Sequence, residues 1–290
     1  MISMKHAKRL PRPSRGGNRI SKVWPVRHAF QVAYDGARYF GFVRQPGHPT
    51  VEAELLEIFS KCGLYHDLRD VTYRVAARTD RGVSGMGQVV ALDVLWEPNL
   101  QELNSVLPED IAVLAAVEVK PDFNPRTQAQ SKHYCYVCEA PHSFNLPTAR
   151  EAAKLFEGTH DLSHFCKREP GKPTTGDLEH VRVRGKKILV FDFIARGFLW
   201  QQVRRMVEGL LAVGKGALSV EELKSMLDGR EKHSMRPSPA DGLFLVDTKY
   251  LSFRFRPDAR ARKRFVGYLK SLKHPRYGVM AAPLCRKGFV

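Results

Sequence analysis

The chain has 290 residues, of which 43% are hydrophobic and 27% are charged, and its formal net charge is +17. Such a large apolar fraction can fill a core, which excludes an intrinsically disordered chain. No stretch of about 18 apolar residues occurs, so the sequence predicts no transmembrane helix. The start of the chain lacks the apolar core of a secretory signal, and the five scattered cysteines are expected to be reduced thiols in the cytoplasm.

The positive charge is concentrated at the two ends of the sequence. Residues 1–27 contain eight Lys and Arg and no acid, residues 252–290 contain eleven and one acid, and residues 28–251 are nearly neutral. Basic arms on a neutral body indicate a polyanionic partner, and we expect a nucleic acid, because such arms gain affinity by displacing counterions. The alternatives are solvated tails or, at the N-terminal end, a transit peptide, whose helix Pro11 and Pro13 would interrupt. Neither arm shows the extended amphipathic pattern of a membrane-surface helix, so no membrane partner is expected.

The first half of the sequence predicts alternating strands and helices. Alternating and β-branched stretches indicate strands, whereas apolar residues three and four apart indicate helices. The predicted order is a strand at 28–34, a helix at 51–61, strands at 70–77 and 88–94, a helix at 98–106 and a strand at 111–119. The segment Phe123–Arg126 then interrupts the pattern, and we place a boundary there.

A second series of elements begins at residue 131. We predict a strand at 131–139, helix 148–156, a charged loop at 167–178, a hairpin with strands 181–183 and 187–194, helices 198–213 and 219–229, and strand 243–250. Thr148 and Glu151 have the spacing of a capping box. Both series predict an α+β fold, with helices against mainly antiparallel strands. The chain then divides into a basic arm at 1–27, halves at 28–125 and 126–251, and a basic extension at 252–290.

The strongest chemical signal is the segment Arg78–Val83, which reads Arg-Thr-Asp-Arg-Gly-Val. A strand delivers Arg78, and Gly82 permits a sharp turn that would expose Asp80 on a fixed scaffold. An ionised carboxylate in a basic cleft suits nucleophilic attack or metal binding. The alternative is an ordinary turn with solvated charges, because Asp-Arg-Gly is a common tripeptide.

Cys135 and Cys138 form a single CxxC pattern with His133 and His142 nearby. One such pair, without a second pair at the spacing of a zinc site, is weak evidence for metal binding or redox chemistry. The pair also lies in a predicted strand, where side chains three positions apart point to opposite faces. We therefore expect no metal site at these cysteines.

Several blocks, spread in order over about residues 28–251, are similar to those of one family. The segment 77–83 resembles the GRTDxGV signature of TruA-type tRNA pseudouridine synthases, and Tyr34–Gln45 resembles their YDGxxYxGWxxQ block. The other blocks match TVE at 50–52, NxxLP at 104–108, FxxR at 123–126, KxYxY at 132–136, FLxxMVR at 198–204 and GLYLVDV at 242–248.

The resemblance implies roles for particular side chains. Asp80 stands where the family has the catalytic aspartate that attacks the target nucleoside, and Arg204 where it has the arginine paired with that aspartate. Tyr134 matches the tyrosine that stacks on the target base, and Arg78 matches the arginine that enters the space left by the extruded nucleotide. Two further arginines are expected to contact the substrate RNA: Arg81, which stands where the family commonly has Ala, and Arg126, which is otherwise a surface cation.

The resemblance also implies the fold, the reaction and the partners. The family has the pseudouridine synthase fold, with two similar halves around a basic cleft, and its members act on tRNA as homodimers. Their usual targets are uridines at positions 38 to 40 in the anticodon stem-loop. The reaction breaks the N1–C1′ bond of uridine and joins C5 to C1′ without a redox step or a phosphate donor, so no cofactor is expected.

Other readings of the same residues stay open at this point. Without the motifs, Tyr134 reads as a core residue and Arg204 as a solvent-facing one. The alternative functions are a non-catalytic RNA-binding protein on the same scaffold and a pseudouridine synthase that acts on another RNA. A metal-dependent nuclease would combine Asp80 with His160 or Asp161, although that stretch resembles the family's GxHDF segment, which we interpret as structural. The sequence departs from the family pattern at four positions: Phe42, Ala77, Arg81 and Ser84. None of these departures removes a residue that the chemistry needs.

Overall fold

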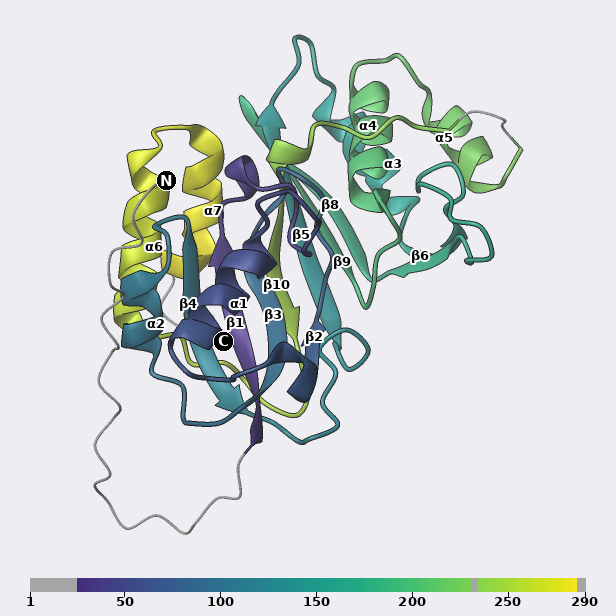
Figure 1. The fold of residues 1–290 in the computed structure, drawn as a ribbon. Coiled ribbons are helices and arrows are strands. Elements are labelled where there is room, and N and C mark those ends of the chain that lie inside the picture. The colour runs from purple at the N-terminus through teal and green to yellow at the C-terminus, as the bar shows by residue number, and fades with distance from the viewer. Residues whose placement is uncertain (1–24, 231–233, 286–290) are drawn as a thin grey trace.

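The computed structural model describes residues 25–230 and 234–285, and an eight-stranded sheet forms its centre (Figure 1). Its strands are β1 (Val26–Tyr34), β2 (Tyr73–Val75), β3 (Ser84–Val94), β4 (Ile111–Glu118), β5 (Ser131–Glu139), β8 (His180–Gly185), β9 (Ile188–Ala195) and β10 (Leu243–Lys249). A separate two-stranded sheet joins β6 (Gly158–Asp161) to β7 (Thr175–Leu178). The helices are α1 (Val51–Lys61), α2 (Leu100–Val106), α3 (Leu146–Lys154), α4 (Gln202–Gly214), α5 (Val220–Leu227), α6 (Ala259–Ser271) and α7 (Pro275–Cys285). No helix in these described ranges is long and apolar enough to cross a membrane.

The strand order of the sheet repeats. One series runs β4-β1-β3 with β2 also on β3, and the other runs β10-β5-β9-β8. In both series, with the strands counted in chain order, the fourth strand lies beside the first, the first beside the third, and the third beside the second. The two series meet where β10 pairs with the start of β3, and this short contact is parallel, whereas the other pairings are antiparallel. The predicted α+β fold with mainly antiparallel strands is confirmed.

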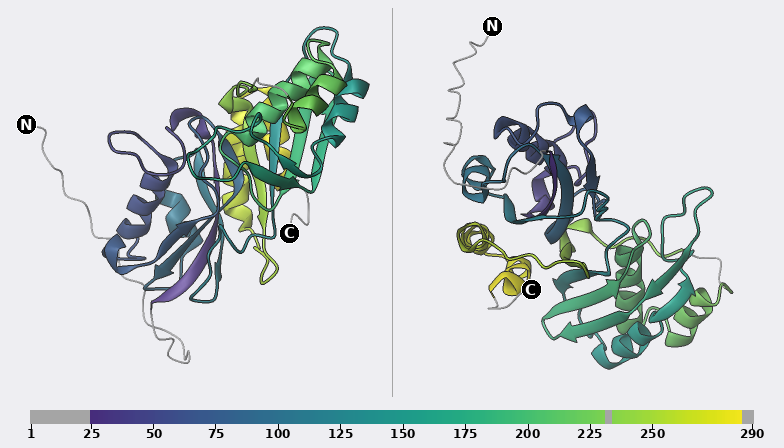
Figure 2. Two further views of the ribbon diagram at one scale, coloured as in Figure 1. Left: turned by 90° about the vertical axis from the view of Figure 1, so that its right-hand side faces the viewer. Right: turned by 90° about the horizontal axis from the view of Figure 1, so that it is seen from below.

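Helices cover both faces of the sheet. On one face, Phe30 and Val32 of β1 pack against α1 and α2, and Tyr134 and Tyr136 of β5 belong to the cluster under α3, α4 and α5. On the other face, alternate residues such as Cys135 belong to the cluster under α6 and α7. In Figure 2 the yellow α6 and α7 lie on the opposite side of the sheet from α3 and α4. This alternation also separates Cys135 from Cys138, as the CxxC analysis predicted.

The basic C-terminal extension is folded over residues 259–285, and the expectation that it lacks an amphipathic pattern is wrong. In α6 the buried residues Ala261, Phe265 and Leu269 recur every four positions, so they form one apolar stripe. Basic residues at the intervening positions hide this stripe in the sequence. Of the N-terminal arm, residues 1–24 lie outside the described residues, and Val26 and Arg27 begin β1.

Several predicted boundaries move for local reasons. Helix α3 begins at Leu146, before the predicted Thr148, because the side chain of Asn145 accepts the backbone N–H of Thr148. The Thr148–Glu151 capping box is therefore wrong. The predicted strand at 70–77 is reduced to β2, while β3 begins four residues earlier than expected. Helix α4 begins at Gln202 rather than at 198, and the predicted loop at 167–178 contains β7.

Candidate active site

Asp80 lies in the turn that leads into β3, close to the junction of the two strand series. The backbone N–H of Val83 donates to the Asp80 carbonyl at 3.1 Å, and Gly82 adopts a φ of 80°. That backbone conformation favours glycine, which explains the Asp-Arg-Gly sequence. The turn therefore presents the Asp80 side chain at the end of a fixed strand.

The segment Tyr34–Phe42 holds this turn from one side. The Tyr34 hydroxyl is 2.8 Å from Thr79 Oγ1, and the Phe42 N–H donates to the Thr79 carbonyl at 3.1 Å. A Cβ on Gly36 would lie 2.1 Å from the Val83 carbonyl oxygen, so only glycine permits this approach. The two blocks of the sequence, Tyr34–Gln45 and Ala77–Val83, thus form one structural unit.

Both oxygens of the Asp80 carboxylate accept hydrogen bonds from the other half of the chain. Arg204 Nη1, on α4, is 3.2 Å from Oδ2, and Trp200 Nε1 is 3.3 Å from Oδ1. The Asp80 side chain is 27% exposed and that of Arg204 is 14% exposed. A carboxylate oxygen accepts more than one hydrogen bond, so this group is oriented and still open to a substrate. The predicted proximity of Asp80 and Arg204 is confirmed.

Ser238 fixes the direction of the Arg204 side chain. Its carbonyl accepts from Arg204 Nε at 2.7 Å, and its own N–H donates to the Arg204 carbonyl at 3.1 Å. The Ser238 hydroxyl donates to Glu208 one turn along α4 at 2.8 Å. Ser238 is only 1% exposed, so these bonds are protected from water. With Nε bound to Ser238, the Nη1 group of Arg204 points at Asp80.

Tyr134 lies near Asp80, on the face of the sheet that α4 covers. It is 9% exposed, and its ring meets the edge of Phe198 at a centroid distance of 5.0 Å. Burial, with smaller contributions from the Tyr34 hydroxyl and the Asp80 carboxylate, raises the pKa of Tyr134 far above its ordinary value. Tyr134 is therefore a neutral aromatic surface next to the carboxylate.

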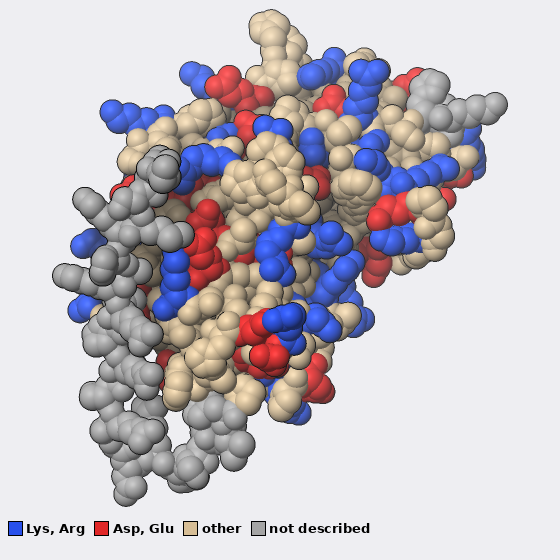
Figure 3. Space-filling model, viewed as in Figure 1, with Lys and Arg blue, Asp and Glu red and all other residues tan. Residues whose placement is uncertain are grey.

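The three other predicted arginines are exposed and do not bind Asp80. Arg78 makes no hydrogen bond or ion pair within the part of the chain that the structure describes. The Arg81 guanidinium lies 4.1 Å from the ring centroid of Phe40, and Arg126 lies on the loop before β5. Figure 3 shows Lys and Arg side chains, together with Asp and Glu, over the face of the molecule that it draws.

Sequence reasoning missed Trp200 and Ser238. Trp200 occupies one of the unspecified positions in the block 198–204, and its side chain is 42% exposed. The Lys167 ammonium lies 3.9 Å from the centroid of its ring. A large aromatic residue near a predicted catalytic arginine could have drawn attention to it. Ser238 has no such signal, because its role depends on a loop distant in sequence.

The residues of the nuclease alternative have local partners. Asp161 accepts from the Thr174 hydroxyl and the Ser163 N–H, which join the segments around β6 and β7. His160 contacts the Glu157 carbonyl at 2.8 Å. Among the described residues, no group of three or more His, Cys, Asp or Glu side chains lies close enough to hold a metal ion, so the structure does not combine them with Asp80 into one metal site.

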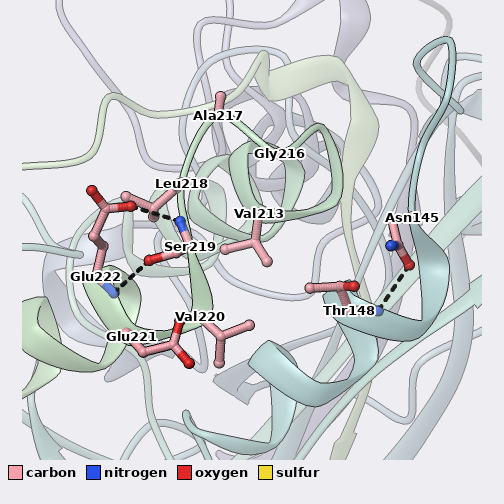
Figure 4. Close-up of a pocket in the computed structure, with 10 residues that line it drawn as sticks. All are labelled: Asn145, Thr148, Val213, Gly216, Ala217, Leu218, Ser219, Val220, Glu221 and Glu222. Atoms are coloured by element: carbon pink, nitrogen blue, oxygen red, sulfur yellow. Dashed lines mark hydrogen bonds between the residues drawn. The ribbon is translucent and has the colours of Figure 1, made fainter.

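A separate hollow of about 450 Å³ lies at the ends of α3, α4 and α5 (Figure 4). Its polar groups serve helix caps: Asn145 accepts from the Thr148 N–H, and Ser219 and Glu222 form a reciprocal capping box. Asp80, Arg204 and Tyr134 are not among its lining residues, so it is distinct from the candidate active site.

Comparison with known proteins finds relatives over most of the chain. The model of a family described as tRNA pseudouridine synthase matches residues 152–251. A tRNA pseudouridine synthase A from Pyrococcus abyssi is 40% identical over 245 residues, which cover 83% of this chain and 90% of the relative. Its counterpart from Methanothermobacter thermautotrophicus is 37% identical, over 83% of this chain and 88% of the relative. A crystal structure of a pseudouridylate synthase is a distant match, with 12% identity and a TM-score of 0.32 over 81% of this chain and 70% of that one.

Proposed function

Since this chain belongs to the tRNA pseudouridine synthase A family of isomerases that act on tRNA, we propose that it modifies uridines 38 to 40 of the anticodon stem-loop with Asp80 as its catalytic carboxylate. The observation that carries this proposal is the Asp80–Arg204 pair. Its two members come from different halves of the chain, yet they meet at 3.2 Å beside the aromatic ring of Tyr134. A solvated turn would not need a buried, doubly anchored arginine.

The proposed reaction needs a carboxylate that is charged, aimed and reachable. The N1–C1′ bond of uridine breaks, the uracil rotates, and C5 bonds to C1′; C5 loses its hydrogen and N1 gains a proton. The Asp80 carboxylate promotes the first bond cleavage, and Arg204 holds its Oδ2 in place. Such preorganised charge is the main means by which enzymes lower barriers of this kind.

The target base must leave its stack before it reaches Asp80, which costs a few kcal/mol. Tyr134 offers an aromatic ring for the extruded uracil, and the exposed Arg78 is free to enter the space that the base leaves. Arg81 and Arg126 are exposed cations suited to phosphate contacts. These roles rest on the family resemblance, together with the exposure of the three arginines and the position of Tyr134 near the Asp80 carboxylate.

We also propose that the protein works in the cytoplasm as a homodimer, with tRNA lying across both subunits. The family resemblance supports this assembly. Sedimentation of the free protein and of its tRNA complex would measure the stoichiometry directly. A single subunit bound to each tRNA would contradict the dimer.

Transcripts of tRNA labelled with tritium at uracil C5 test the proposed function. Bond formation at C5 must release that hydrogen to water, so tritium release reports the reaction itself. Replacing uridines 38, 39 and 40 in turn by cytidine should remove the release that each one contributes. Tight binding without any release would instead favour a non-catalytic RNA-binding protein, and release from other positions would favour another target.

A further inference from the structure

A buried carboxylate connects the C-terminal helices to the catalytic turn. Asp35 is 4% exposed, and its Oδ2 accepts from the hydroxyls of Tyr268 on α6 at 3.0 Å and Tyr277 on α7 at 3.3 Å. Its Oδ1 accepts from the Ser84 hydroxyl at 3.2 Å and the Ala37 N–H at 3.2 Å. Two tyrosines more than 230 positions away thus complete the hydrogen bonds of this one group.

The other end of this network lies at Asp80. Ser84 is the first residue of β3, and its hydroxyl also accepts from the Gly36 N–H at 3.0 Å. Gly36 in turn packs directly on the backbone of Val83. Any shift of Asp35 or Ser84 is therefore transmitted to the turn that presents Asp80, because backbone atoms in such close contact cannot move independently.

The same helices also contact the segment that orients Arg204. Arg276 Nη1 forms an ion pair with Asp241 at 2.7 Å, and Arg276 also binds the hydroxyl of Tyr277. Asp241 lies three residues after Ser238, whose carbonyl holds Arg204. Residue Ala240, between them, faces Gly82 of the catalytic turn. The hairpin of α6 and α7 therefore contacts, from behind the sheet, both the segment that supports Asp80 and the segment that orients Arg204.

We propose that Tyr268, Tyr277 and Arg276 are positioning residues, through which the α6–α7 hairpin holds Asp80 and Arg204 in register. This inference rests on the proposed function and goes beyond it, because it assigns a catalytic purpose to two helices that lie on the opposite face of the sheet from Tyr134 and α4. Packing alone would require only the apolar stripe of α6 and α7. A buried carboxylate with two tyrosine donors adds desolvation costs that apolar packing avoids, so its function is to fix geometry.

Conservative variants separate positioning from packing. The double variant Tyr268→Phe and Tyr277→Phe removes two hydroxyls and keeps both rings. We expect kcat for tritium release to fall about tenfold, with unchanged affinity for tRNA. Tyr250→Phe is the matched control, because its buried hydroxyl donates to the Pro125 carbonyl at 2.8 Å instead of to Asp35. An equal kcat in the double variant and the control would overturn the proposal.

A second measurement does not depend on activity. Amide hydrogen exchange in the segment 80–84 should be faster in the double variant than in Tyr250→Phe, because the turn loses its support. If the wild-type protein released no tritium, the proposed function would fail, and the exchange rates would still decide whether the hairpin holds the turn. Unchanged exchange at 80–84 would refute the positioning role. Deleting α6 and α7 is unsuitable, because the deletion would expose the core beneath them.

Discussion

At the scale of single residues, the role of Arg204 depends on two N–H donors that point in different directions. Nε is committed to the Ser238 carbonyl and Nη1 to Asp80, so a lysine could keep the charge but not both bonds. We expect Arg204→Lys to lower kcat about 100-fold with little change in tRNA affinity, as measured by single-turnover tritium release and filter binding.

The neighbouring Arg205 provides the matched control for Arg204. It also bonds a backbone carbonyl, that of Met235, and it contacts Gln201, but it does not touch Asp80. Arg205→Lys should therefore leave kcat within about twofold of the wild type. Equal losses in the two variants would mean that α4 needs its arginines for stability and not for the orientation of Asp80.

Lys132 is a buried cation whose titration should be visible in stability. It is 6% exposed, and burial, with a smaller contribution from the charge of Arg126, lowers the pKa of its ammonium from 10.5 to about 8. Between these two values the unfolded chain binds more protons than the folded one, so this residue makes the folded state more stable as pH rises. Below pH 8 the folded protein bears the full free-energy cost of burying the charged ammonium of Lys132.

Lys132→Met should therefore raise the free energy of unfolding at pH 7 by about 2–3 kcal/mol. The advantage over the wild type should shrink as pH rises from 8 towards 10.5, because the wild-type lysine then becomes neutral in both states. Urea titrations of both proteins across this range measure the difference. A gain that is independent of pH, or a loss at pH 7, would show that Lys132 carries no desolvation penalty.

The residues that the sequence predicts best are those with a local motif. Asp80 stands in a turn whose glycine needs a positive φ, and Tyr134 and Arg204 lie in blocks with fixed internal spacing. Their meeting depends on the fold, which the family resemblance supplies. Trp200 and Ser238 could not be predicted in this way, because their hydrogen bonds to Asp80 and Arg204 form only once distant segments meet in the fold.

At the scale of elements, the start of α3 shows why spacing alone misleads. Thr148 and Glu151 have the spacing of a capping box, but Asn145 accepts the Thr148 N–H and Pro147 occupies the first turn, where its missing N–H costs nothing. We expect Asn145→Ala to cost about 1 kcal/mol of unfolding free energy and Thr148→Ala less than about 0.5 kcal/mol. Thermal melts of both variants test this, and the reverse ranking would restore the capping box.

The C-terminal helices show a different limit of sequence analysis. Residues 252–290 read as a basic arm because their charge is high, yet α6 and α7 bury Phe265, Leu269, Met280 and Leu284. Long basic side chains lie on the outer face of an amphipathic helix as readily as in a solvated tail. High net charge therefore does not by itself distinguish a folded segment from a solvated arm.

At the scale of the whole molecule, the two strand series join through a very close backbone approach. A Cβ on Gly87 of β3 would lie 2.2 Å from the Cα of Asp247 on β10, and neither strand can yield without breaking the sheet. Gly87→Ala should therefore cost about 2–3 kcal/mol of unfolding free energy.

Gly267→Ala is the matched control for this substitution. It lies inside α6 with nothing within 4 Å of the added methyl group, so it should stabilise the protein by about 0.5–1 kcal/mol. Urea titrations should thus give opposite signs for the same chemical change. A loss in both variants would place the sensitivity elsewhere than at the junction of β3 and β10.

The central claim is that the Asp80 carboxylate performs the chemistry and is not needed to bind tRNA. Single-turnover tritium release by Asp80→Asn, with tRNA affinity measured on the same preparation, tests this claim most directly. The substitution keeps the size of the side chain and the oxygen facing Arg204 or Trp200, so folding and binding should persist. We predict unchanged affinity and a rate at least about 10³-fold below the wild type. Release at a rate close to the wild type would show that another residue is the catalyst and that the Asp80–Arg204 pair is structural.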